Sequence, residues 1–111
     1  MTTLNRSNRE ITFDDALEAL RACVRRRLLV NLMESNPRRE SAQFEELSFE
    51  GDAKYFETQL RHVHLPKLAE MGFVEWDRES GRIVKGPAFD EIRPLLEVLT
   101  RHEDELPDGY L

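Results

Sequence analysis

Apolar residues recur along the chain at two different spacings, and each spacing predicts a different element. Between residues 52 and 71 apolar residues recur three or four positions apart, typical of an amphipathic helix, at Phe56, Leu60 and Val63, and again at Leu68 and Met71. We expect this helix to end at Gly72, since glycine accepts a positive φ without steric cost. Residues 73–77 and 82–85 then flank a polar turn at 78–81, which predicts a β-hairpin.

Pro66 lies inside the predicted helix, where it should kink the helix or separate its last turns. When Phe56, Leu60 and Val63 face inward, a polar face points outward. That face and its two basic flanks comprise Lys54, Tyr55, Thr58, Arg61 and His62. It offers hydrogen-bond donors, an aromatic ring and positive charge, which suit contacts with base edges in DNA. The alternative is a solvated helix face in a domain that binds protein.

Two further helices are predicted before this segment. Thr12 starts the first in capping-box style with Asp15, and its apolar face comprises Phe13, Ala16, Leu17, Leu20 and Val24. The second contains Leu28, Leu29, Leu32 and Met33. It should stop at Asn36-Pro37, because proline lacks a backbone donor. A charged loop at 37–43 and a short helix at 44–49 follow, and Asp52 is expected to cap the long helix.

The last predicted helix runs from Glu91 to about His102, capped by Asp90, with Pro94 in its first turn where no backbone donor is needed. Its apolar stripe is wide for a peripheral helix, so we expect it to pack against a second subunit together with the first helix. The predicted dimer interface comprises Phe13, Leu17, Phe89, Ile92, Leu95, Leu96 and Leu99. Residues 1–11 are expected to be flexible, and residues 103–111 to form a mobile acidic tail.

The order of elements predicts a mainly α fold with a small β-hairpin, an α+β class. A long helix that leads into a hairpin is typical of a winged helix-turn-helix domain, here residues 12–102. In such a domain the recognition helix, here about 52–71, enters the major groove, and the wing, here about 73–86, contacts the flanking backbone. A chain of 111 residues is long enough for one such domain with a single modest core.

The charge balance is unusual for a DNA-binding protein. Sixteen basic and 22 acidic residues give a net charge of −6, whereas a DNA-binding surface is usually basic. Arg25, Arg26 and Arg27 form one positive cluster, and residues 38–39 form another. These clusters either contact phosphates beside the motif or are plainly solvated.

The turn of the predicted hairpin carries charges of both signs. Arg78 and Arg82 resemble the wing arginine that enters a minor groove in many winged helices. Three acidic residues of the same hairpin, Glu75, Asp77 and Glu79, would repel phosphate. The hairpin is therefore weaker support for DNA binding than the long helix.

Catalytic and metal-binding patterns are absent from the sequence, so we expect neither an enzyme nor a cofactor. There is no phosphate-binding glycine loop, no nucleophile elbow and no pair of closely spaced cysteines. His62 and His64 are two positions apart on a helix and diverge, so a metal site would need ligands from two chains. Cys23 is expected to be a small buried apolar residue, and Trp76 to serve in packing. Neither a signal peptide nor a membrane-spanning run is apparent, which favours a cytoplasmic protein.

Two stretches carry a family resemblance. HLPKLAEMGFVEWD, residues 64–77, resembles the end of the recognition helix and the start of the wing in ArsR-type winged-helix regulators. It is more similar still to an uncharacterised winged-helix family of halophilic archaea, and LEALRACVRRRLLVNLME resembles the first two helices of that family. The resemblance covers about residues 12–101. It implies a winged helix and, through kinship with ArsR-type proteins, regulation of transcription.

Two functions remain open at this stage. The first is a homodimeric transcriptional regulator that binds double-stranded DNA. In this case the negative net charge reflects the surface composition of a halophilic protein, which the three lysines against 13 arginines also suggest. Its predicted DNA-binding residues are Lys54, Tyr55, Thr58, Arg61, His62, Arg25, Arg26 and Arg82. The second is a winged-helix protein-interaction module that does not bind DNA. A single surface shared by the basic residues favours the first function, and acidic residues among them favour the second.

Overall fold

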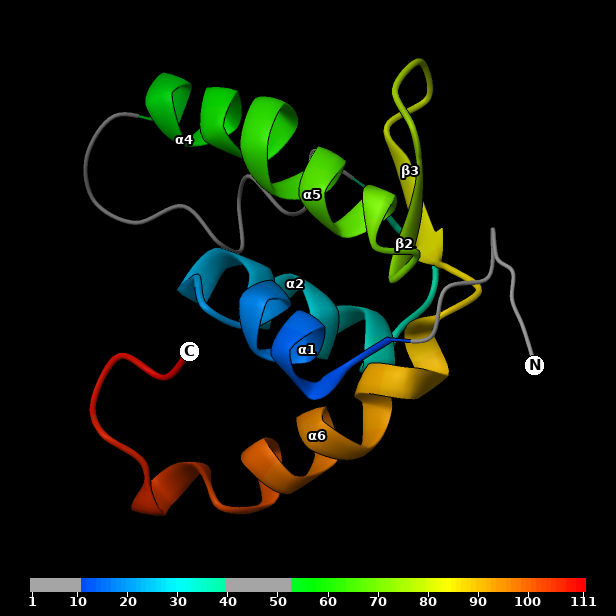
Figure 1. Cartoon of the computed structure of the whole chain (residues 1–111). Coiled ribbons are helices and arrows are strands. Elements are labelled where there is room, and N and C mark those ends of the chain that lie inside the picture. Colours follow the sequence, from blue (N-terminus) through cyan, green and yellow to red (C-terminus); the bar gives the residue numbers. More distant parts are fainter. Residues whose placement is uncertain (1–10, 40–52) are drawn as a thin grey trace, which may run out of the picture.

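The computed structural model describes residues 11–39 and 53–111 (Figure 1). Within these ranges the protein is mainly helical with a three-stranded antiparallel sheet, so the predicted α+β class is confirmed. Helices α1 (Phe13–Ala19) and α2 (Cys23–Glu34) lie between a long helix on one side and α6 (Phe89–Arg101) on the other. The predicted helix at 44–49, the cap at Asp52 and most of the N-terminal segment fall outside the described residues.

Helix α1 begins with the predicted capping box. The backbone N–H of Asp15 donates to the Thr12 hydroxyl at 3.0 Å, and the backbone N–H of Thr12 donates to the Asp15 carboxylate at 3.1 Å. Two backbone donors that the helix leaves without internal partners are thereby satisfied. Within the apolar face predicted for this helix, Ala16 and Leu20 are buried, whereas Phe13 is 66% and Leu17 48% exposed. The inward side consists of small residues and Leu20, which let α1 lie close to its neighbours, and Val24 belongs to α2.

The long helix consists of α4 (Ala53–Gln59), the π-helical segment η1 (Leu60–His64) and α5 (Leu65–Glu70). We call residues 53–70 the central helix. Pro66 is the second residue of α5, so its missing N–H falls directly after the π-helical turn. The predicted effect of Pro66 therefore takes the form of a wider turn, in which the Leu65 N–H donates to the Leu60 carbonyl five residues back.

The wider turn changes which side chains of the central helix face the core. Leu60 and Leu65 are fully buried, five residues apart, whereas Val63 is 43% exposed. The prediction of Val63 as a core residue was wrong, because it assumed a regular α-helix throughout. The extra residue in the π turn rotates Val63 away from the side that Leu60 occupies.

The central helix ends as predicted at Gly72, which has a φ of 85°. The backbone N–H of Phe73 donates to Leu68 and that of Gly72 to Ala69, both at 3.0 Å. This pair of bonds is a Schellman motif and satisfies carbonyls that the helix end would otherwise leave free. The chain then enters the sheet directly.

The predicted hairpin forms from β2 (Val74–Asp77) and β3 (Arg82–Lys85), and its first strand starts one residue later than predicted. A third strand, β1 (Arg38–Arg39), pairs antiparallel with β3 and gives the order β1-β3-β2. These two arginines were predicted to lie in a loop. Two residues cannot show strand periodicity, and their partner strand lies far along the chain.

Helix α6 starts earlier than predicted, with Ala88 at its N-cap and no side-chain cap, so the cap assigned to Asp90 was wrong. Pro94 consequently lies in the helix interior and not in its first turn. Phe89, Ile92 and Leu96 are 0–1% exposed. The chain's own core therefore covers the centre of the apolar stripe that was expected to need a partner.

One hydrophobic core connects the described helices with the sheet. Its fully buried large side chains are Leu28, Leu29, Leu32, Leu60, Leu65, Leu68, Phe73, Ile83, Phe89, Ile92 and Leu96. Because α1 and α2 form the middle layer, the central helix keeps its other face towards solvent (Figure 1). Among the described residues, the helices lack the combined length and apolar character that crossing a membrane requires.

Candidate functional site

The solvent side of the central helix carries the polar residues predicted for it. Lys54, Tyr55, Thr58 and His62 are exposed, and Arg61 is half-buried at the flank. Tyr55 is 63% exposed, so its aromatic ring is accessible at the surface. We call these five residues the outer face.

Arg61 connects the outer face to the hairpin. Its guanidinium carbon lies 5.7 Å from the centroid of the Trp76 ring, and that of Arg78 lies 4.5 Å from the same centroid. A guanidinium above an indole is held by the negative potential of the ring face. The indole therefore gathers two positive charges, one from the central helix and one from the hairpin turn.

Two of the three acidic residues of the hairpin lie on the other side of β2. Successive side chains of a strand alternate between faces, so Glu75 and Asp77 point away from the face of Val74 and Trp76. Asp77 lies opposite Arg82 in the ladder, and Trp76 lies opposite Ile83. Arg82 thus belongs to the acidic side and is separated from Arg61, with which it was predicted to act.

Hydrogen bonds within the hairpin turn stabilise its conformation. The Asp77 carboxylate accepts from the backbone N–H of Glu79 at 3.0 Å, and the Gly81 N–H donates to the Asp77 carbonyl at 2.8 Å. Hydrogen bonds from the Ser80 side chain and from the turn backbone lower the pKa of Asp77 below its usual value. Arg39 of β1 donates to the Ser80 carbonyl at 3.1 Å. These contacts fix the position of Arg78 at the tip.

Arg25 is part of the protein interior, and its prediction as a DNA contact was wrong. The side chain is only 3% exposed, and it donates to the carbonyls of Ala19 at 2.9 Å and Glu18 at 2.8 Å. Its third contact is His64 Nδ1 at 3.3 Å. Arg25 therefore ties the C-terminal end of α1 to α2 and to the π-helical turn. A guanidinium buried in this way cannot reach a phosphate.

The contact between Arg25 and His64 fixes the state of the imidazole. Arginine has only donors, so His64 Nδ1 must accept, which places the ring proton on Nε2. Burial, and secondarily the Arg25 charge, lower the pKa of His64 below its usual value. His64 is consequently neutral and structural, whereas His62 is exposed on the outer face.

Arg26 is likewise engaged within the chain. It donates to the carbonyls of Leu20 at 2.7 Å, Tyr110 at 2.6 Å and Gly109 at 3.1 Å, and its guanidinium carbon lies 5.9 Å from the Tyr110 ring centroid. The C-terminal segment is therefore anchored on α2, contrary to the predicted mobile tail. Arg26 is not available as the DNA contact that the sequence suggested. The arginine cluster of α2 looked like a phosphate-binding patch because its partners lie far away in sequence.

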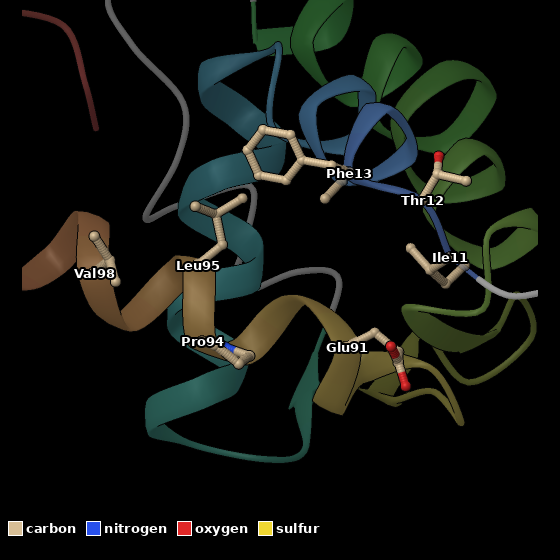
Figure 2. Close-up of a pocket in the computed structure, with 8 residues that line it drawn as sticks. Ile11, Thr12, Phe13, Glu91, Pro94, Leu95 and Val98 are labelled. Carbon is tan, nitrogen blue, oxygen red and sulfur yellow. The ribbon is translucent and has the colours of Figure 1, made fainter.

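A groove of about 410 Å³ runs between the start of α1 and α6 (Figure 2). It is lined by Ile11, Thr12, Phe13, Ala16, Glu91, Pro94, Leu95 and Val98. Two of its apolar lining residues are exposed, Phe13 at 66% and Val98 at 46%. Of the predicted interface residues, Phe13, Leu17, Leu95 and Leu99 are accessible at least in part, whereas Phe89, Ile92 and Leu96 are enclosed by the chain itself.

Metal-ligating residues do not gather at any point in the described segments. Cys23, the first residue of α2, is half-buried and unpaired. His64 faces Arg25 in the interior, whereas His62 is exposed, so the two imidazoles point in different directions as predicted.

Two residues of this surface were not recognised in the sequence as functional candidates. Trp76 was assigned to packing, although its inward register opposite Ile83 places it beside the central helix. Val63 was assigned to the core. Pro66 was the available signal for both the altered turn and the changed position of Val63, but the sequence does not show where the register shift falls.

A family model supports a similarity for the part of the chain that carries this surface. The model of a domain of unknown function, DUF7344, matches residues 45–84, a little over a third of the chain. The match includes the central helix and the hairpin as far as Val84. No curated protein and no solved structure matches the chain. The similarity is thus to a family whose description assigns no activity.

Proposed function

We propose that this protein is a DNA-binding transcriptional regulator with a winged helix-turn-helix. In this proposal the central helix is the recognition helix, which lies in a major groove, and the hairpin is the wing. The order of elements supports it, with two helices, a short strand that pairs with the hairpin, a long helix that leads into the hairpin, and a last helix.

The observation that carries the proposal is the stack of Arg61 and Arg78 on Trp76. It couples the outer face to the hairpin, and it concentrates positive charge where the two would meet one DNA backbone. Thr58 and His62 on the same face have the hydrogen-bonding groups that can contact base edges. Glu75 and Asp77 point to the opposite side of the strand, so they do not interrupt this surface.

A second candidate is a protein-interaction module that does not bind DNA. It is favoured by the loss of Arg25 and Arg26 from the accessible positive charge, in a chain whose net charge is −6. Glu57 is also exposed on the central helix. In this case the outer face with Tyr55 would bind a protein partner.

The proposal also includes a homodimer formed through α1 and α6. Its support is the groove of Figure 2, where exposed Phe13 and Val98 border an apolar hollow. A second copy related by a twofold axis would present the same groove and the same aromatic side chain. Two recognition helices would then lie on one side of a duplex.

The experiment is selection of binding sequences from fragmented genomic DNA, followed by affinity measurements across a salt series. Arg61→Ala should weaken binding by about 1–3 kcal/mol if Arg61 contacts a base. If it contacts phosphate, binding should weaken on every sequence and the salt slope should fall by about one.

Arg101→Ala is the matched control, since it removes an exposed arginine from α6. Helices α1 and α2 separate α6 from the central helix and its outer face (Figure 1). It should leave affinity and salt slope nearly unchanged. Absence of DNA binding by the parent protein at low salt would overturn the proposal and favour the interaction module.

A further inference from the structure

Val63 is exposed for a reason that lies in the backbone. In a regular α-helix, Val63 would lie near the side of Leu60, three residues earlier. The π-helical turn replaces that relation with one five residues long, so Leu65 becomes the next fully buried side chain after Leu60. Val63 is left 43% exposed in the middle of the central helix.

The neighbours of Val63 show which way it turns. His62 before it is exposed, and His64 after it points inward to Arg25 at 3.3 Å. Leu60 and Leu65 define the buried side. Val63 therefore lies between the inward side and the outer face, and the wider turn brings it towards Thr58 and His62.

A single exposed valine on a surface is ordinary. Val63, however, is next to polar residues that are proposed to contact bases, and the π-helical turn is what exposes it. Such turns are rare in proteins, and many of those that occur lie at functional sites. The chemical group that a branched apolar side chain can recognise in a major groove is the methyl group of thymine.

We propose that Val63 is a specificity-determining residue that recognises a thymine methyl group. This inference rests on the proposed DNA-binding function and adds a base preference to it. Thr58 and His62 supply polar contacts, and Val63 supplies an apolar one beside them.

The test uses the sequence that the protein selects from a random DNA pool. Each thymine of that sequence is replaced in turn by uracil, which lacks only the methyl group. At one position the parent should lose affinity about fourfold, which corresponds to about 0.8 kcal/mol for one buried methyl-sized group. Val63→Ala should bind the thymine and uracil versions of that position nearly equally. Its salt slope should match that of the parent, because no charge changes.

Thr100→Ala is the control, since Thr100 is a half-buried branched residue of α6, which lies on the far side of α1 and α2 (Figure 1). It should retain the full fourfold difference at the thymine position. Both variants should remain folded, as circular dichroism can verify, because neither side chain belongs to the core.

Three results would overturn the inference. These are a selected sequence without any thymine whose methyl group matters, a Val63→Ala variant that keeps the full thymine preference, and a control variant that loses it. In each of these cases DNA binding itself survives. Failure of the parent to select any sequence would instead refute the proposed function, and the assignment of Val63 with it.

Discussion

Replacing Arg25 by methionine should destabilise the fold strongly, although Arg25 lies in what looked like an exposed basic cluster. The change removes the donors for two backbone carbonyls and for His64 Nδ1. Hydrogen bonds from a charged donor contribute about 1.5–3 kcal/mol each. The methionine recovers part of this, because it fills the space of the arginine stem and removes the cost of burying a charge.

The net expectation for Arg25→Met is a loss of about 2–4 kcal/mol in the free energy of unfolding. That is a large fraction of the roughly 5–15 kcal/mol typical of a domain. It corresponds to a fall in Tm of about 8–16 °C. Arg25→Lys should recover only part of the loss, since one ammonium group cannot span three acceptors arranged for a planar guanidinium.

Urea unfolding followed by circular dichroism measures this loss, and Arg21→Met provides the control. Arg21 pairs with Glu18 at 3.4 Å, but its side chain is 71% exposed, so its removal should cost less than about 1 kcal/mol. If Arg25→Met costs no more than Arg21→Met at an unchanged m-value, the buried network does not stabilise the protein as argued. If Arg25→Met weakens DNA binding under conditions where it is fully folded, its assignment to the interior is wrong.

Two further predictions concern acid stability and assembly. The pKa of His64 is lowered in the folded state by burial and by Arg25, so the unfolded chain binds the proton more readily. The resulting stability is complete above the ordinary histidine pKa of about 6.5 and is lost as pH falls through the lower folded value. Urea titrations over this range should show a weaker pH dependence for His64→Gln than for the parent. Sedimentation should detect a dimer at high micromolar concentration. Phe13→Glu should raise the dimer dissociation constant more than about tenfold, since burying phenylalanine contributes about 1.5–3 kcal/mol. A monomeric parent would contradict the proposed dimer.

The elements that could be predicted from the sequence are those whose determinants are local. The hairpin formed within one residue of its predicted boundaries because its turn, including Gly81 at a φ of 77°, is encoded in four consecutive residues. The capping box of α1 needs only Thr12 and Asp15. Gly72 ended the central helix because a positive φ there requires glycine.

The features that could not be predicted depend on contacts between distant residues. Arg26 reaches the carbonyl of Tyr110, 84 residues away, and Arg25 reaches His64, 39 residues away. No local pattern distinguishes such arginines from solvated ones. The burial of Val63 was predicted wrongly for a different reason. One added residue in a helical turn changes the direction of every later side chain.

The candidate surface was predicted in part. The outer face depends on helical periodicity before the π-helical turn, so its members up to Thr58 followed from the sequence. The pairing of Arg61 with Trp76 depends on how the hairpin folds back, which only the three-dimensional structure shows.

The junction beside Gly86 provides a way to recognise other chains built like this one. A methyl group at position 86 would lie 2.4 Å from the Gly72 carbonyl oxygen, and the backbone N–H of Ala88 donates to that same oxygen at 2.8 Å. Position 86 therefore excludes every side chain for steric reasons, and position 72 favours glycine for its positive φ. Two glycines separated by 13 residues, with a strand pair and its turn between them, form a spacing signature for this junction. It can identify chains in which the end of the long helix and the start of the last helix are joined in the same way, even where their surfaces have diverged.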